Sequence, residues 1–140
     1  MTTFPLKIVT PDGLIYDGPA EEVVVRTTSG DLGIMAGHTN CVAPLGMGRA
    51  MILTSEGRRY AACIGGMISV LHGEVSLVPT TFEWSDKIDL KRAMTAEERA
   101  RKMLENKDSS KKEARLAEAR LRRALVRRSV AEQAQSRPGM

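Results

Sequence analysis

Glycine is distributed very unevenly along the chain, and this distribution constrains the fold more than any other feature. Eleven of the 12 glycines lie before residue 88, and the last is Gly139. The charge changes at the same place, because residues 1–87 hold 6 basic and 9 acidic side chains whereas the remainder holds 15 basic and 8 acidic ones. Glycine favours turns and weakens helix interiors. The sequence therefore predicts a glycine-punctuated domain over residues 1–86, a helical domain over residues 87–135 and a disordered tail over residues 136–140.

The first domain has the pattern of short strands joined by turns. Residues 4–9 alternate apolar side chains, and residues 22–28 are rich in β-branched ones. Ser55-Glu56-Gly57 and His72-Gly73 each separate two apolar runs, as hairpin turns do. Many short strands without intervening helices predict an antiparallel β-sandwich.

The second domain has the composition of helices. Between residues 88 and 137 it lacks glycine and proline, and Ala, Arg, Glu, Lys and Leu dominate. Apolar side chains recur at helical spacing in two stripes, Leu90, Ala93, Ala100 and Leu104 in the first and Ala114, Ala117, Leu121 and Ala124 in the second. Glu97 interrupts the first stripe, and residues 106–110 form a loop with capping side chains. The fold class expected is α+β, with an antiparallel two-helix hairpin after the sandwich. Because its apolar face is mostly alanine, this hairpin is weakly held and can leave its docking site.

No pattern for catalysis or metal binding is present. The sequence lacks a Gly-x-Ser-x-Gly nucleophile motif and a Gly-rich phosphate loop. Cys41 and Cys63 form no Cys-x-x-Cys pair, and with two isolated histidines they do not make a closed zinc ligand set. We therefore expect a chain that is not an enzyme, has no metal site and keeps its cysteines reduced.

The chain has no pattern of membrane insertion or secretion. Its longest nearly uncharged apolar stretch, residues 61–71, is shorter than the roughly 20 residues that span a bilayer. The N-terminus lacks the basic flank and apolar core of a signal peptide. We expect the protein in the cytoplasm, free or bound to a membrane complex.

Arginines of the second domain are candidates for binding a phosphate chain. Arg92 and Arg99 share one helix face, and Arg123 and Arg127 share a face of the other helix. Guanidinium groups that converge can each donate paired hydrogen bonds to phosphate, and Asp89 can accept from a ribose or an adenine. One alternative is a solvated basic face paired with neighbouring glutamates. Another is nucleic-acid binding, although no aromatic side chain follows Trp84 to stack on bases.

Five segments resemble, in order and spacing, the epsilon subunits of F-type ATP synthases. These segments are residues 7–13, 28–38, 45–48, 65–70 and 88–93. Within the second, Gly30-Asp31-Leu32-Gly33-Ile34 followed by His38 is similar to the most distinctive stretch of the family. The sequence departs from the family at Ala36, at Thr39-Asn40-Cys41 and at Phe82-Glu83-Trp84.

The resemblance implies a β-sandwich of about ten strands, a helical hairpin and a rotor role. The sandwich of the family joins the gamma subunit to the ring of c subunits in the central stalk of a proton-translocating synthase. Asp31 and His38 match the segment that meets the ring. Extended along gamma, the hairpin of many relatives reaches the alpha and beta subunits of the catalytic head and blocks ATP hydrolysis. The residues that would supply this inhibitory charge are Arg122, Arg123, Arg127 and Arg128.

Some bacterial relatives bind ATP on the folded hairpin. The matching positions are Glu83, Asp89, Arg92, Arg99, Arg123 and Arg127. The resemblance thus implies that ATP is a regulatory ligand, that no cofactor is required and that the protein is peripheral to the cytoplasmic face of the cell membrane. The alternative is a stand-alone nucleotide-sensing or nucleic-acid-binding module that uses the basic hairpin.

Overall fold

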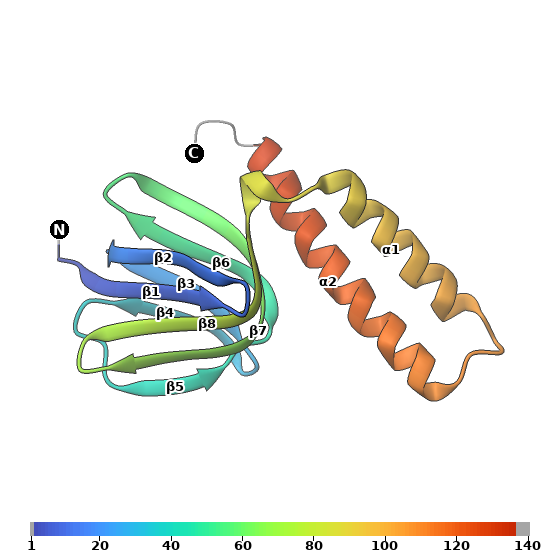
Figure 1. Cartoon of the computed structure of the whole chain (residues 1–140), viewed down its shortest axis with the longest axis horizontal. Coiled ribbons are helices and arrows are strands. Elements are labelled where there is room, and N and C mark those ends of the chain that lie inside the picture. Colours follow the sequence, from blue (N-terminus) through green and yellow to red (C-terminus); the bar gives the residue numbers. More distant parts are fainter. Residues whose placement is uncertain (1, 137–140) are drawn as a thin grey trace.

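The computed structural model describes residues 2–136, which form a β-domain followed by two α-helices (Figure 1). The strands are β1 (Phe4–Thr10), β2 (Gly13–Ala20), β3 (Glu22–Thr27), β4 (Gly30–Met35), β5 (Cys41–Pro44), β6 (Met47–Thr54), β7 (Gly57–Leu71) and β8 (Glu74–Trp84). A short 3-10 helix, η1 (Ser85–Lys87), leads to α1 (Leu90–Glu105) and α2 (Lys111–Ser136). Residues 137–140 of the expected tail lie outside the described residues.

The strands form a sheet that folds over into a sandwich, as the sequence predicted (Figure 1). Their order is β2-β1-β8-β7-β6-β3-β4, and β5 pairs with β7. Every pairing in the described residues is antiparallel except that of β1 with β8, where Leu6 lies opposite Val75 in a parallel register. This parallel pair places the first strand of the chain beside the last one. Strands from both ends of the β-domain therefore enclose the same core.

The described residues contain eight strands where about ten were expected, because β7 and β8 are long. These strands have 15 and 11 residues and pair along most of their length. Gly65 and Gly66 bend β7 with φ values of +67° and +92°, and a Cβ at Gly66 would lie 2.0 Å from the Val78 carbonyl oxygen. The pairing keeps the same register on both sides of this bend, so the glycine pair is a kink and not a register-shifting bulge.

The core lies between the layers of the sandwich and is aliphatic. Alternate side chains of β1, which are Phe4, Leu6 and Ile8, are buried while their neighbours face outward. Ile34, Ile52, Ile68 and Leu77 are also fully buried. Each such side chain contributes about 1.5–3 kcal/mol through burial. The buried cluster is confined to residues 4–82, so the sandwich core includes no helix residue.

The two helices form an antiparallel hairpin with an alanine interface. Ala93, Ala100, Ala117 and Ala124 are buried between them. Ser110 caps α2 by accepting a hydrogen bond from the Glu113 N–H at 3.1 Å. Near its C-terminal end, α2 buries Val130 and Ala131, and the sandwich strands that it contacts most are β6 and β7. Figure 1 shows the other end of the hairpin pointing away from the sandwich.

Candidate nucleotide-binding site

A cavity of about 450 Å³ lies where β8, η1 and both helices meet, and it is lined by four of the six residues expected to bind nucleotide. Glu83 comes from the end of β8, Asp89 and Arg92 from the start of α1, and Arg127 from α2. Ala93, Ala96 and Ala124 form the apolar part of the wall. Small-molecule sites commonly have volumes of about 300–1,000 Å³ with a few convergent polar groups. The structure therefore assembles a polar cavity from segments that are 44 residues apart in the chain.

Two of the residues that line this cavity form an ion pair. The Arg127 Nε donates to Glu83 Oε1 at 2.7 Å, and their side chains are 27% and 39% exposed. Because the pair is partly solvated, it holds α2 to the sandwich only modestly. It also means that a phosphate binding Arg127 must compete with the Glu83 carboxylate.

Asp89 has a structural contact as well as a place in the cavity. Its Oδ1 accepts a hydrogen bond from the Arg92 backbone N–H at 3.0 Å, so Asp89 is the N-cap of α1. One carboxylate oxygen is therefore used locally, and the other is available to a hydroxyl or an amine. The Arg92 side chain is exposed at the rim.

The other two expected residues do not line this cavity. Arg99 lies further along α1 and is exposed. Arg123 instead lines a second, larger cavity between α2 and the sandwich, together with Arg26 and Arg122. Four of the six residues therefore line the first cavity, Arg123 lines the second and Arg99 lines neither, while Arg127 lies in the wall of both.

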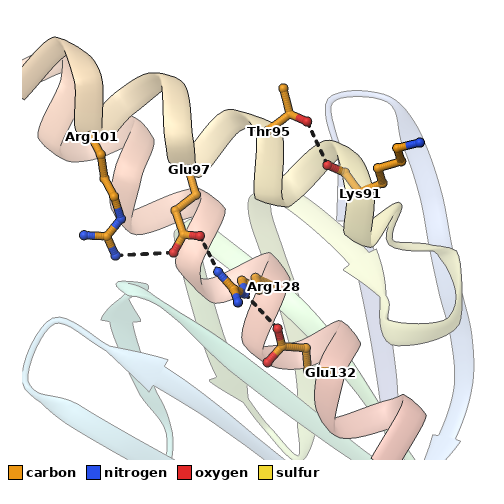
Figure 2. Close-up of polar contacts among 6 residues, drawn as sticks. All are labelled: Lys91, Thr95, Glu97, Arg101, Arg128 and Glu132. Atoms are coloured by element: carbon orange, nitrogen blue, oxygen red, sulfur yellow. Dashed lines mark hydrogen bonds and ion pairs between the residues drawn. The ribbon is translucent and has the colours of Figure 1, made fainter.

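The four arginines expected to form an inhibitory basic face point in different directions. Arg127 reaches the sandwich at Glu83, whereas Arg128 reaches α1, where its Nη1 lies 2.5 Å from Glu97 Oε2. The Arg128 Nε also donates to Glu132 at 2.7 Å (Figure 2). Arg122 and Arg123 make no ion pair within residues 2–134. Two of the four charges are therefore neutralised within the docked hairpin.

Glu97 is a residue whose importance the sequence did not reveal. Only 7% of it is exposed, and Figure 2 shows its carboxylate between Arg128 of α2 and Arg101 of its own helix. The hydrogen bond from Arg128, and to a smaller extent that from Arg101, holds the pKa of this carboxyl below its ordinary value, although burial acts in the opposite direction. The signal for this role in the sequence was that Glu97 interrupts an apolar stripe. An acid buried in such a stripe requires a cationic partner.

The residues expected at a ring interface lie on the β4 side of the sandwich. Asp31 is exposed on β4 and pairs with Arg26 Nε at 3.0 Å. His38 lies in the loop after β4, where its Nδ1 is 2.8 Å from the Thr39 carbonyl oxygen. Met35, between them in the chain, is 58% exposed. Acidic, imidazole and apolar groups are thus all accessible on one edge.

Within the described residues, no group of three or more His, Cys, Asp or Glu side chains is arranged to hold a metal ion. Cys41 and Cys63 are free thiols, and burial raises the pKa of the Cys63 thiol to about 12. None of the described helices is long and apolar enough to cross a membrane.

The fold and the cavity define a class of two-domain protein in which a β-sandwich carries a helical hairpin and a polar cavity opens where they join. Two protein-family models match this chain. "ATP synthase, Delta/Epsilon chain, beta-sandwich domain" matches residues 3–85, and "ATP synthase, Delta/Epsilon chain, long alpha-helix domain" matches residues 86–132. The chain belongs to the family of ATP synthase delta/epsilon chains. A member of this family is a subunit of the synthase and not a catalytic unit by itself.

Individual relatives agree with this assignment. The ATP synthase epsilon chain of Bacillus pumilus is 41% identical over 110 residues, which are 79% of this chain and 84% of the relative. That of Caldicellulosiruptor saccharolyticus is 37% identical over 107 residues, covering 76% and 78% of the two chains. A chain in the mitochondrial ATP synthase of Euglena gracilis has the same fold, with a TM-score of 0.80 at 21% identity over 98% of this chain and 83% of that one. Of the two interpretations of the sequence, the synthase subunit is favoured over the stand-alone module.

Proposed function

We propose that this chain is the epsilon subunit of a bacterial, proton-translocating F-type ATP synthase, where it joins the gamma subunit to the ring of c subunits. The observation that carries this proposal is the match of both family models, in order, across residues 3–132. The similar fold within a Euglena gracilis assembly described as OSCP, F1 and c-ring supports it. The complex would hold the protein at the cytoplasmic face of the cell membrane as a peripheral subunit.

The division of labour we propose follows the two domains. The sandwich, residues 1–86, would make the rotor contacts, and the hairpin, residues 87–135, would regulate ATP hydrolysis at the alpha and beta subunits. Asp31 and His38 would contact the ring, because an exposed acid and an imidazole can pair with basic and polar loop groups. Arg122, Arg123, Arg127 and Arg128 would supply the positive charge when the hairpin extends.

Co-purification tests the rotor assignment. We expect the tagged chain to recover gamma and c subunits from membranes, and the double variant Asp31→Ala, His38→Ala to recover about tenfold less c subunit with gamma unchanged, since rim charges set such contacts. The matched control is Asp17→Ala, which removes an exposed acid from β2. If the wild-type chain recovers neither the gamma subunit nor the c subunit, the rotor role is contradicted.

The cavity at Glu83, Asp89, Arg92 and Arg127 supports a regulatory ATP site on the docked hairpin. A ligand held by β8, α1 and α2 at once binds only when the hairpin is folded against the sandwich, so it shifts the population toward that state. Arg99 and Arg123 would join the site only after side-chain movement. ATP would act as a regulator here and not as a substrate.

Calorimetry tests the nucleotide site separately. We expect wild-type protein to bind ATP and Arg92→Ala to weaken binding at least about tenfold, because a charge-assisted hydrogen bond to phosphate is lost. Lys91→Ala is the matched control, since Lys91 is exposed on the same turn but does not line the cavity. If both variants weaken ATP binding equally, or if wild-type protein gives no heat of ATP binding, the proposed ATP site is wrong. The rotor role would not be affected by either result.

A further inference from the structure

The contacts between the hairpin and the sandwich are concentrated near the C-terminal end of α2. Contacts with the sandwich strands are made mainly by α2, to β6 and β7. Val130 and Ala131 are buried there, whereas Arg123 and Val126, which precede them, line the larger cavity between α2 and the sandwich. Figure 1 shows the hairpin pointing away from the sandwich beyond this cavity. We call residues 127–133 the α2 latch.

Two consecutive arginines of the α2 latch are occupied by acids of other elements. Arg127 Nε donates to Glu83 Oε1 of β8 at 2.7 Å. Arg128 Nη1 donates to Glu97 Oε2 of α1 at 2.5 Å, and Figure 2 shows this contact between the two helices. A guanidinium N–H that donates to one carboxylate is not available to a second acidic surface. The docked hairpin therefore withholds two of the four arginines that would inhibit hydrolysis.

A third contact of the α2 latch comes from β6. Arg49 Nη1 donates to Gln133 Oε1 near the end of α2. The Arg49 guanidinium also lies over the Tyr60 ring of β7, with Cζ 4.7 Å from the ring centroid, and this stacking favours one orientation of the arginine. Gln133 follows the buried Val130 by three residues, so the two lie on the same side of the helix. Polar and apolar docking contacts thus occur together.

These contacts fall within about two turns of one helix, so they form and break together. A partly exposed ion pair or a single hydrogen bond contributes little by itself. Because a helix moves as a rigid element, the loss of one contact weakens the attachment of the whole segment. The population of the docked hairpin should therefore respond to the removal of any one partner side chain.

We propose that the α2 latch is a self-masking device, in which Glu83, Glu97 and Arg49 hold the hairpin down and the two acids withhold Arg127 and Arg128 from inhibition. This inference rests on the inhibitory role proposed above for those arginines. Docking and inhibition use the same guanidinium groups, so each excludes the other. Glu97 acts here as a positioning residue, because it sets how often Arg128 is released.

Amide exchange of the full chain without nucleotide measures the docked population. Glu97→Gln keeps the shape of the side chain and all four arginines but removes the charged acceptor, so we expect exchange in α2 to rise about tenfold. The matched control is Glu98→Gln, which breaks only an exposed pair with Lys102 and should leave exchange within about twofold of wild type.

A second pair of variants tests the contact from the sandwich. Arg49→Met removes the donor to Gln133 and should raise exchange in α2 about threefold. Arg58→Met is its control, because Arg58 is exposed on β7 and makes no ion pair in the described part of the chain.

ATP hydrolysis by synthase reconstituted with each variant separates a latch from a purely structural contact. A damaged hairpin inhibits less, whereas an opened latch with intact arginines inhibits more. We expect hydrolysis with Glu97→Gln to fall about threefold below that with wild-type protein, because the population shifts toward the extended hairpin. A chain ending at Lys87 tests the proposed function separately, since it lacks the hairpin and should give faster hydrolysis than wild type.

The outcomes distinguish the latch from the function on which it rests. Faster exchange with slower hydrolysis in Glu97→Gln and Arg49→Met, and neither change in their controls, supports the α2 latch. Unchanged exchange in Glu97→Gln, or equal acceleration in Glu98→Gln, overturns it. If the chain ending at Lys87 gives faster hydrolysis but Glu97→Gln does not slow it, the masking is wrong although the hairpin inhibits. If the shortened chain gives no faster hydrolysis, the inhibitory role itself is wrong, and the masking is wrong with it.

Discussion

The Glu97 carboxylate lies in the interface between the two helices, where most of the other buried residues are alanines. A charge in such a place is tolerated because Arg128 and Arg101 approach from two sides. Two consecutive arginines of α2 contact different elements, because Arg127 reaches the sandwich and Arg128 reaches α1. At the scale of single residues, α2 is therefore fastened separately to each of its two neighbours.

The stability of the hairpin should depend on pH through Glu97. Arg128 lowers the pKa of this carboxyl in the folded state, so its stabilising contribution is present above the unfolded value of about 4.3 and is lost as pH falls through the lower folded value. We expect amide exchange in α1 and α2 to rise in that acid range. The step should vanish in Glu97→Gln and persist in Glu98→Gln, whose carboxylate makes an exposed pair with Lys102. An identical acid step in both variants would contradict the assignment.

At the scale of elements, the kink in β7 determines how a 15-residue strand takes part in both layers of the sandwich. Gly65 and Gly66 both have positive φ, where side chains other than glycine are disfavoured. Gly65 also lines the larger cavity between α2 and the sandwich. The path of one strand is thus linked to the shape of the surface that faces α2.

Gly66→Ala should be severely destabilising. The added Cβ would lie 2.0 Å from the Val78 carbonyl oxygen, in backbone that cannot move without breaking the β7–β8 pairing. We expect a loss of more than about 3 kcal/mol in denaturant unfolding, or failure to fold. Gly33→Ala is the control, because φ is not positive there and the nearest atom, Val24 Cγ2, is 3.9 Å away. A Gly66→Ala protein as stable as Gly33→Ala would show that the kink is not required.

At the scale of the whole molecule, the sandwich has a large apolar core of its own, whereas the hairpin does not. The sandwich core lies within residues 4–82 and is built from large aliphatic side chains. The hairpin buries mainly alanines, and α2 reaches β6 and β7 with only part of its length. Large movements of the hairpin therefore cost little core packing.

Truncation tests this asymmetry. A chain ending at Lys87 should retain cooperative unfolding, because none of its core residues is removed. The isolated segment 88–136 should be largely unfolded at 25 °C, since short helices without a substantial apolar interface are marginal in water. Circular dichroism and thermal unfolding measure both. A non-cooperative sandwich fragment would mean that the helices are part of its folding unit.

The sequence predicted the fold well because the fold depends on local patterns. Glycine-marked turns, alternating strands such as β1, and alanine-rich helical stripes each leave a signal within a few residues. The expected count of about ten strands was less accurate, since uninterrupted pairing across Gly65 depends on the partner strand. The parallel pairing of β1 with β8 had no local signal either, because it joins the first and last strands.

The candidate site was predicted in part. Residue types at helical spacing made Arg92, Arg127 and Asp89 candidates, and all three line one cavity, but spacing could not show that Arg123 and Arg99 lie away from it. By itself, the sequence determined the two domains' secondary structure and the supply of basic side chains. Only the tertiary structure decided which arginine meets which carboxylate, because Glu83 and Arg127, or Glu97 and Arg128, become neighbours only when elements 31 to 44 residues apart pack together.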